Sequence, residues 1–327
     1  MIARASGPLL ITVVGPTAIG KTRLAIEIAC ALNAEILSSD SRQFYREIPI
    51  GTAQPTAEER AMAPHHFVDF LSIHQDYSSG QFESDAARWL QGHFKERIEH
   101  TRPPVAVMAG GSGLYVQAVH AGLDEIPSSP EVRAELNAVF ESEGLAPLLV
   151  ELKLKDPKHH AAVDPSNPHR VIRALEVCRC SGQPYSTFRQ TQESQLKVHP
   201  GGWARHERRQ WDTLTIGIGA PREFLHDRIN RRVHTMMDQG WLKEAEQVIP
   251  HRELNALKTV GYPPLFDLLE GKTDMDTAIR KIQETTRQFA RRQLTWFHRR
   301  PDVHWVDARQ PQAGVDLAIQ FVRNGHI

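Results

Sequence analysis

The segment from residue 9 to residue 32 constrains the fold most. Leu9–Val14 is an unbroken apolar run, and Leu24, Ile28 and Leu32 recur every four residues beyond a glycine-rich turn. The run is typical of a parallel strand buried on both faces, and the later spacing is typical of a helix that packs one face on that strand. The sequence therefore predicts a strand, a tight turn and a helix in direct succession.

The turn between them carries a phosphate-binding motif. It fits the pattern G-x-x-x-x-G-K-[ST] throughout, with Gly15, Pro16, Thr17, Ala18, Ile19, Gly20, Lys21 and Thr22. Glycines let backbone N–H groups close around a phosphate, and the N-terminus of the following helix adds positive potential. Lys21 would supply a point charge and Thr22 a hydroxyl ligand for Mg²⁺. The motif predicts a di- or triphosphate ligand and does not say which one.

Three more apolar runs predict further strands. Ala34–Leu37 ends at a Ser-rich cluster with Asp40, Val105–Ala109 ends at Gly110–Gly113, and Thr213–Ile218 comes later. Strands that alternate with helices indicate a parallel sheet with right-handed crossovers, and ligands bind beyond the carboxyl ends of such strands. We therefore predict an α/β fold with a P-loop NTPase-like parallel sheet core.

A mostly helical insertion interrupts this pattern. Residues 124–202 are rich in Pro, Arg and Lys, contain short helical patterns and show little strand character. We predict that residues 1–123 and 203–327 form the P-loop core, with a basic helix near the C-terminus, and that residues 124–202 form a separate helical domain.

Composition sets limits on the partners. The 327 residues have a formal net charge of zero and are 40% apolar, so a polyanion has to be met by local basic patches. Three cysteines make no disulfide framework, and the apolar run Leu9–Val14 is too short to cross a bilayer. We expect a cytoplasmic protein without a membrane partner, and nothing in the sequence requires more than a monomer.

Asp40 is the only acidic residue at a predicted strand end near the P-loop. An ATPase usually places an acid at the end of an apolar strand to help hold Mg²⁺, but Val105–Ala109 ends in glycines and Ser112. Asp40 has two interpretations of equal weight on spacing alone. It is either a turn residue that bonds its own backbone, or a base or metal-shell carboxylate that faces the phosphate site.

Several blocks together resemble one family, the bacterial tRNA dimethylallyltransferases, also called tRNA isopentenyltransferases. The blocks occur in family order from residue 15 to about residue 307: Gly15–Thr22, Asp40–Tyr45, Ile50–Thr56, Pro64–His66, Gly110–Tyr115, Asn167–Arg170, Val260–Tyr262 and Arg292–Trp296. As a set they are far more specific than the P-loop alone.

The resemblance implies an enzyme that transfers the dimethylallyl group of dimethylallyl diphosphate to the exocyclic N6 of the adenine 3′ to the anticodon. The P-loop would then hold a departing diphosphate with Mg²⁺, which fits the missing second acid. Asp40 matches the family's catalytic carboxylate, which accepts a proton from the amine, and Lys21 and Ser112 match the other catalytic positions. The family also extrudes the base into a channel that the diphosphate enters from the other side.

The resemblance further implies tRNA contacts along the chain. The matching positions are Asp40, Ser41, Arg42, Gln43, Ser112, Arg133, His169, Arg170, Val171, Ile172, Arg173, Lys258, Thr259, Val260, Gly261, Tyr262, Pro263, Arg291, Arg292, Gln293, Leu294, Thr295, Trp296, Phe297 and His298. Independently of the family, residues 280–300 carry seven Arg or Lys against Glu284 alone, which favours phosphate contact. Ile282, Phe289 and Trp296 repeat every seven residues, so Trp296 is expected in the core.

Three other readings compete with this one. A small-molecule P-loop kinase shares the strand, P-loop and helix but has no evident use for the insertion or the basic segment of residues 280–300. An enzyme that prenylates free adenine nucleotides would not need the insertion residues that match tRNA contacts. A non-catalytic RNA-binding module would not need Lys21, Thr22 and Asp40 together.

Overall fold

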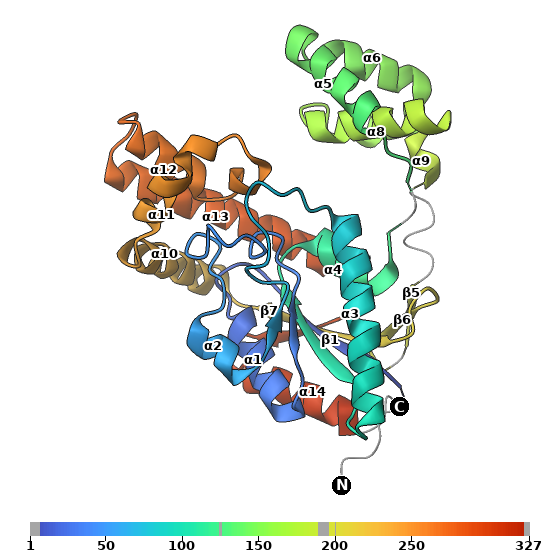
Figure 1. Cartoon of the computed structure of the whole chain (residues 1–327), viewed down its shortest axis with the longest axis vertical. Coiled ribbons are helices and arrows are strands. Elements are labelled where there is room, and N and C mark those ends of the chain that lie inside the picture. Colours follow the sequence, from blue (N-terminus) through green and yellow to red (C-terminus); the bar gives the residue numbers. More distant parts are fainter. Residues whose placement is uncertain (1–6, 124–125, 189–195, 200, 324–327) are drawn as a thin grey trace. The chain divides into compact units, whose positions relative to one another are not determined.

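The computed structural model describes residues 7–123, 126–188, 196–199 and 201–323. The chain divides into two compact units, a core unit of residues 1–122 with 197–327 and a helical unit of residues 123–196 (Figure 1). The predicted start of the insertion, residue 124, lies outside the described residues. Its predicted end at residue 202 is too late, because the strands from Leu196 onward join the sheet of the core unit.

The core unit contains a sheet that has eight strands in the described part of the chain. The strands are β1 (Leu9–Val14), β2 (Ile36–Ser38), β3 (His65–His66), β4 (Val105–Gly110), β5 (Leu196–Val198), β6 (Ala204–His206), β7 (Asp212–Gly219) and β8 (Val303–Asp307). Their order is β3-β2-β4-β1-β7-β6-β5, and β8 also pairs with β7. Only β6 is antiparallel to its described partner, β7, while β1 lies parallel to both β4 and β7. The predicted α/β class with a parallel core is confirmed.

Alternate residues of β1 face two different hydrophobic cores. Leu10 and Val14 join one core, and Leu9, Ile11 and Val13 join the other, and all five are fully buried. A strand covered on both faces has no exposed side, which explains why Thr12, bonded to His120, is its only polar residue. This burial fixes the direction of β1 and hence where the P-loop emerges.

Helices cover both faces of this sheet. Those of the core unit are α1 (Lys21–Leu32), α2 (Ala57–Met62), α3 (Ser79–Glu99), α4 (Gly113–Ala121), α10 (Arg222–Asp238), α11 (Trp241–Val248), α12 (Tyr262–Leu269), α13 (Met275–His298) and α14 (Gln312–Arg323), with 3₁₀ turns η1 (Ile249–His251) and η2 (Asn255–Leu257). Gly240 has φ 95° and separates α10 from α11. No helix in the described ranges is long and apolar enough to cross a bilayer.

The helical unit has a hydrophobic core of its own. It contains α5 (Pro130–Glu143), α6 (Ala146–Lys155), α7 (Pro157–Ala162), α8 (Pro168–Ser181) and α9 (Tyr185–Phe188). Leu136, Leu148, Leu152 and Leu175 are at most 1% exposed and pack around one face of α8. The Asn167 side chain caps α8 by accepting from the Arg170 N–H, as the Asn-Pro start predicts. Such a core can hold this unit together independently of the sheet.

A buried polar network fastens the end of α13 to the middle of the sheet. Arg300 donates to His120 Nδ1 at 2.9 Å and pairs with Asp302, and Thr215 Oγ1 lies 3.2 Å from an Asp302 oxygen. Since Arg300 can only donate, Nδ1 of His120 is the acceptor, and its Nε2–H donates to Thr12 Oγ1 at 2.8 Å. Arg300 is therefore bonded to residues inside the core unit, and it does not belong to the basic surface expected from residues 280–300.

Burial of His120 makes the stability of the fold depend on pH. Burial and the neighbouring Arg300 lower the pKa of His120 to about 3. The unfolded chain binds this proton near pH 6.5, so stability is lost as the pH falls below that value. We expect the free energy of unfolding to decrease by about 2 kcal/mol between pH 7 and pH 5 through this group. Urea unfolding of the wild type and of His120→Gln at both pH values measures it, and an unchanged difference between the two proteins contradicts the assignment.

Candidate active site

The P-loop leaves β1 in a conformation that its glycines make possible. Gly15 has φ 147° and Gly20 has φ 109°, and a Cβ atom on Gly15 would lie 2.7 Å from the carbonyl oxygen of Ile218. A side chain is therefore excluded at residue 15 by both backbone conformation and space. Ile19 is 3% exposed and packs into a hydrophobic core, so its side chain leaves the loop's backbone accessible.

Lys21 lies in the P-loop as the motif predicts. Its Nζ donates to the carbonyl oxygen of Pro16 at 2.9 Å, which folds the side chain back over the loop. Burial lowers the pKa of Lys21 to about 8, although the nearby Asp40 carboxylate opposes this effect. A half-buried cation gains from an incoming anion, because phosphate oxygens would replace part of the hydration that it has lost.

Two cavities open beside this loop, both within the core unit. The first has a volume of about 740 Å³ and is lined by Lys21, Thr22 and Gln54, among others. The second has a volume of about 420 Å³ and is lined by Ser112 and Trp296, among others. Four residues line both cavities and therefore mark where they meet: Thr17, Asp40, Arg232 and Met236.

Asp40 fits both interpretations of its sequence position at once. Its Oδ1 accepts a hydrogen bond from the Arg42 N–H at 3.1 Å, and its own N–H donates to Ser38 Oγ. These bonds make the turn that a Ser-rich corner predicts. Oδ2 accepts no hydrogen bond from the residues that the structure describes, and the carboxylate lines both cavities. One oxygen therefore fixes the side chain, and the other can act on a bound molecule.

Three arginines of α10 add positive charge to the first cavity. Arg228, Arg231 and Arg232 all line it, and Arg228 Nε donates to the Ala18 carbonyl oxygen at 2.8 Å. The Arg232 guanidinium makes no hydrogen bond or ion pair within the described ranges, and burial lowers its pKa. Spacing of three and four residues along α10 puts them on one face, a signal that the sequence analysis missed. Arg222, at the start of the same helix, is exposed and lines neither cavity.

The side chains here suit a hard cation that binds with a phosphate ligand. Thr22 and Asp40 line the same cavity and offer hydroxyl and carboxylate oxygens. Mg²⁺ binds oxygen ligands and typically takes one or two from the protein and the rest from phosphate and water. The donor set therefore fits Mg²⁺ at the P-loop.

Comparison with known proteins identifies relatives along nearly the whole chain. The sequence model of the IPP transferase family matches residues 43–300. The tRNA dimethylallyltransferase of Christiangramia forsetii is 45% identical over 91% of this chain and 93% of its own length. The structure of the tRNA isopentenylpyrophosphate transferase of Bacillus halodurans is 32% identical, covers 97% of both chains and has a TM-score of 0.65. This chain belongs to the IPP transferase family.

A structure from outside the bacteria extends the likeness in fold. A eukaryotic dimethylallyltransferase acting on tRNA is 23% identical, with a TM-score of 0.72 over 92% of this chain and 74% of the other. At that identity the likeness shows a shared fold and nothing more. The resemblance stated from the sequence blocks is confirmed by the family match and by the bacterial relatives.

In this member of the IPP transferase family, Ser112 lies beside the Asp40 segment. Its Oγ accepts from the Ser41 N–H at 3.2 Å and lies 3.3 Å from Ser41 Oγ. The Gln43 amide is bonded at both of its polar atoms. Its Oε1 accepts from Ser38 Oγ at 2.8 Å, and its Nε2 donates to the Ala53 carbonyl oxygen at 2.9 Å. The loops that follow β2 and β4 are thus joined next to the meeting point of the two cavities.

The residues expected to contact tRNA differ widely in exposure. Exposed members are Arg133, His169, Arg170, Lys258, Pro263, Arg291, Arg292, Thr295, Trp296 and His298. Half-buried members are Asp40, Ser41, Arg42, Gln43, Ser112, Arg173, Thr259, Val260 and Leu294. Buried members are Val171, Ile172, Gly261, Tyr262, Gln293 and Phe297. Burial leaves the side chains of the last group almost no exposed surface, and the tRNA contacts expected at all these positions stay predictions.

Each buried member packs inside the unit to which it belongs. Val171 and Ile172 belong to the core of the helical unit, and Phe297 is fully buried in the core unit. Tyr262 donates its hydroxyl to Glu244 at 2.6 Å, and Glu244 also accepts from the Ile50 and Gly51 N–H groups at 2.7 and 2.8 Å. This buried carboxylate ties the loop at Ile50 and Gly51, which lines the cavities, to α11 and α12.

Trp296 is not a core residue as its seven-residue repeat predicted. It is 39% exposed and lines the second cavity, and its ring lies directly against the backbone of Gly113, where a Cβ atom would be 2.3 Å away. The buried face of α13 passes instead through Ile282, Ala290 and Phe297. The sequence prediction was wrong because a helix of 3.6 residues per turn drifts away from a strict seven-residue repeat.

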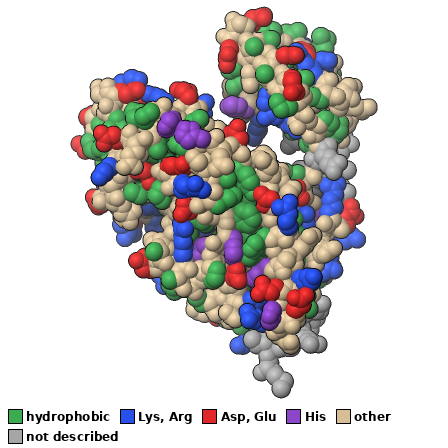
Figure 2. Space-filling model, in the orientation of Figure 1, with side chains coloured by type: hydrophobic (Ala, Val, Ile, Leu, Met, Phe, Trp, Pro, Cys, Tyr) green, Lys and Arg blue, Asp and Glu red, His purple; other side chains and the backbone are tan. Residues whose placement is uncertain are grey.

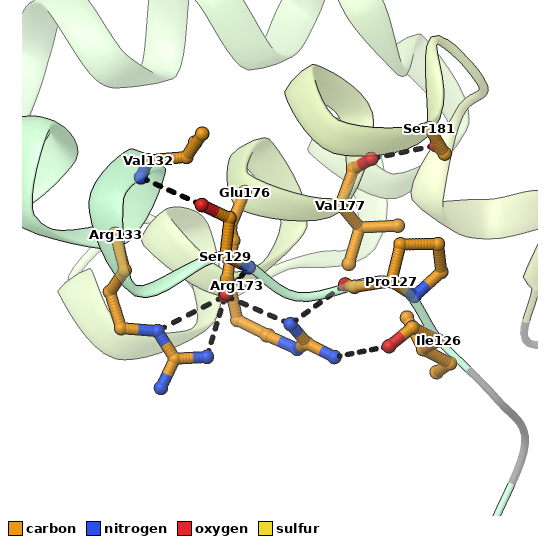
Figure 3. A network of polar contacts seen from close by, with 9 residues as sticks. All are labelled: Ile126, Pro127, Ser129, Val132, Arg133, Arg173, Glu176, Val177 and Ser181. Atoms are coloured by element: carbon orange, nitrogen blue, oxygen red, sulfur yellow. Dashed lines mark hydrogen bonds and ion pairs between the residues drawn. The ribbon is translucent and has the colours of Figure 1, made fainter.

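Two arginines expected to contact RNA share one carboxylate in the helical unit (Figure 3). Glu176 is 1% exposed, and its Oε2 accepts from Arg133 at 2.6 Å and from Arg173 at 2.9 Å. Arg173 also donates to the carbonyl oxygens of Ile126 and Pro127. Arg173 is therefore largely used inside the unit, whereas the Arg133 side chain is 50% exposed and keeps donors for another partner.

The free guanidinium of Arg232 yields a test of the first cavity. We expect Arg232→Gln to weaken the binding of inorganic diphosphate with Mg²⁺ by about tenfold, because a charge-assisted hydrogen bond is lost in a dry site. The matched control is Arg222→Gln, which removes the same charge from an exposed position of the same helix. Isothermal titration calorimetry measures both, and equal affinities of the two variants would remove Arg232 from the anion site.

Proposed function

We propose that this protein transfers the dimethylallyl group from dimethylallyl diphosphate to the exocyclic N6 of the adenine 3′ to the anticodon of tRNA. The observation that carries the proposal is the meeting of two cavities at Asp40. One cavity contains the P-loop and its cations, and the other contains Ser112 and Trp296. The names of the relatives, tRNA dimethylallyltransferase and tRNA isopentenylpyrophosphate transferase, support this reaction.

The proposed reaction exchanges one bond for another at a single carbon. The C–O bond between the dimethylallyl carbon and the diphosphate breaks, and a bond from that carbon to N6 of adenine forms. Asp40 accepts the proton that N6 loses, using the oxygen that is free of its turn bond. The leaving diphosphate takes the electron pair of the broken bond, and its growing charge faces Lys21, Arg228 and Arg232.

Burial of the cations strengthens the diphosphate end of this reaction. Lys21 and Arg232 lie where burial lowers the pKa of each, so their attraction for a diphosphate is little screened by solvent. Thr22 would hold the Mg²⁺ ion, which would supply further positive charge to the diphosphate oxygens. The P-loop backbone, whose conformation needs the positive φ of Gly15 and Gly20, would hold the phosphate groups in place.

The proposed RNA-binding surface consists of local basic groups. Figure 2 shows acidic and basic side chains interspersed over the face it draws, in keeping with a net charge of zero. Arg291 is exposed and unpaired among the described residues, and Arg292 lines the second cavity with its guanidinium 5.9 Å from the Phe289 ring. Arg292 and Trp296 place a cation and an aromatic face at the cavity proposed for the extruded base.

A single assay decides between this function and its rivals. Purified protein is incubated with unmodified tRNA, Mg²⁺ and dimethylallyl diphosphate, and the nucleosides are analysed by mass spectrometry. We expect prenylated adenosine from tRNA and none from free adenosine monophosphate offered in its place. Phosphate transfer from ATP to a small molecule without prenylated adenosine would establish a kinase and overturn the proposal.

The role of Asp40 predicts a loss of turnover without a loss of binding. Asp40→Asn keeps an oxygen for the Arg42 N–H but cannot accept the proton, so we expect kcat to fall by about 10²–10⁴-fold. The dissociation constant for tRNA, measured by filter binding, should stay within about twofold. Asp238→Asn, at an exposed position outside both cavities, serves as the control. A parallel loss of tRNA binding in Asp40→Asn would indicate a structural role instead.

The basic end of α13 predicts a change in salt dependence. Each phosphate contact contributes about one to the slope of log affinity against log salt. We expect Arg291→Gln to weaken tRNA binding and to reduce that slope by about one, because Arg291 is exposed and free of internal partners. Arg323→Gln, an exposed arginine on α14, should leave the slope unchanged. Equal slopes for the wild type and Arg291→Gln would exclude a phosphate contact at this residue.

A further inference from the structure

A buried amide joins the P-loop to the loop after β4. Gln293, on α13, is 5% exposed. Its Oε1 accepts from the Thr17 N–H at 2.8 Å, and its Nε2 donates to the Gly111 carbonyl oxygen at 3.0 Å. One side chain thus satisfies two backbone groups that lie far apart in the sequence, in a place where unpaired polar groups are costly.

The backbone at Gly111 is shaped to receive this amide. A Cβ atom on Gly111 would lie 2.0 Å from Gln293 Nε2 and 3.1 Å from its Cδ. The glycine is therefore needed for space. A methyl group there would displace the Gln293 amide and break both of its hydrogen bonds. The two residues form a matched pair, and changing either one has the same consequence for the P-loop.

The position of Gln293 differs from that of its neighbours on α13. Arg292, Gln293 and Trp296 all line the second cavity. Arg292 and Trp296 are exposed, whereas Gln293 is buried and its amide is bonded to Thr17 and Gly111. Both polar ends of the amide are already bonded inside the protein. Gln293 therefore stands apart from the tRNA contacts that the family resemblance implies for residues 291–298.

We infer that Gln293 is a positioning residue that holds the P-loop at a fixed distance from the loop after β4 and from α13. Thr17 lines both cavities, and its N–H donates to the Gln293 amide. Gln293 therefore fixes the backbone at the point where the two cavities meet. α13 also carries Arg292 and Trp296 in the second cavity. Gln293 consequently fixes the spacing between the diphosphate site and the cavity proposed for the base. This inference rests on the proposed function for its catalytic consequence and on geometry alone for the P-loop.

A double-variant cycle of Gln293→Ala and Gly111→Ala tests the inference. We expect each single variant to weaken binding of inorganic diphosphate with Mg²⁺ by about tenfold and to lower kcat/KM for dimethylallyl diphosphate similarly. The dissociation constant for tRNA should stay within about twofold. The double variant should be no more than about twofold worse than Gln293→Ala, because the amide is already gone. Gln288→Ala, at an exposed position of the same helix, is the control and should match the wild type.

Three outcomes would overturn the inference. One is a loss of tRNA affinity with unchanged diphosphate affinity in Gln293→Ala, which would make Gln293 an RNA contact. Another is multiplication of the two single effects in the double variant. The third is wild-type diphosphate affinity in Gln293→Met, which has a similar volume, lacks both hydrogen bonds and serves if the alanine variant unfolds. Diphosphate binding needs no turnover, so a wild type that fails to prenylate tRNA would refute the proposed function and leave this test intact.

Discussion

Close approach of backbone segments at the carboxyl edge of the sheet governs the rest of this structure. A Cβ atom would lie 2.7 Å from the Ile218 carbonyl oxygen if placed on Gly15, and 2.6 Å from the Ser39 carbonyl carbon if placed on Gly110. The loop after β1 packs on β7, and the loop after β2 packs on the end of β4, only because these positions lack side chains. Their contact brings the P-loop, Asp40 and Ser112 to the two cavities.

The electrostatics of the first cavity follow from this crowding. Lys21 and Arg232 are gathered in a place where burial lowers the pKa of each, and the Asp40 carboxylate partly offsets that effect for both. Cations held this way attract an anion strongly, because little water screens them. The same carboxylate that balances the cations is the group proposed to take the proton from adenine. Charge balance and catalysis therefore depend on one side chain.

Much of the core could be predicted because its causes are local in the sequence. β1, β4 and β7 are buried on both faces and read as apolar runs, and the P-loop has fixed spacing between a strand and a helix. Gln293 could not be predicted, because its partners Thr17 and Gly111 are 276 and 182 residues away. The prediction that Trp296 lies in the core was wrong for a similar reason. Its neighbour Gly113 comes from another element, and the sequence period alone put the side chain in the core.

Two arginines of the helical unit, Arg133 and Arg173, bind the same carboxylate but differ in exposure. Its core is separate from the two cores around the sheet, and its Glu176 carboxylate is buried between Arg133 and Arg173. Arg173 donates hydrogen bonds to Glu176 and to the carbonyl oxygens of Ile126 and Pro127, so it orders the start of the unit. Arg133 shares the carboxylate but stays half exposed. Because Glu176 holds the Arg133 guanidinium in place, Arg133 would lose less side-chain entropy on binding a phosphate. This favours Arg133 over less restrained arginines of the unit as the proposed RNA contact.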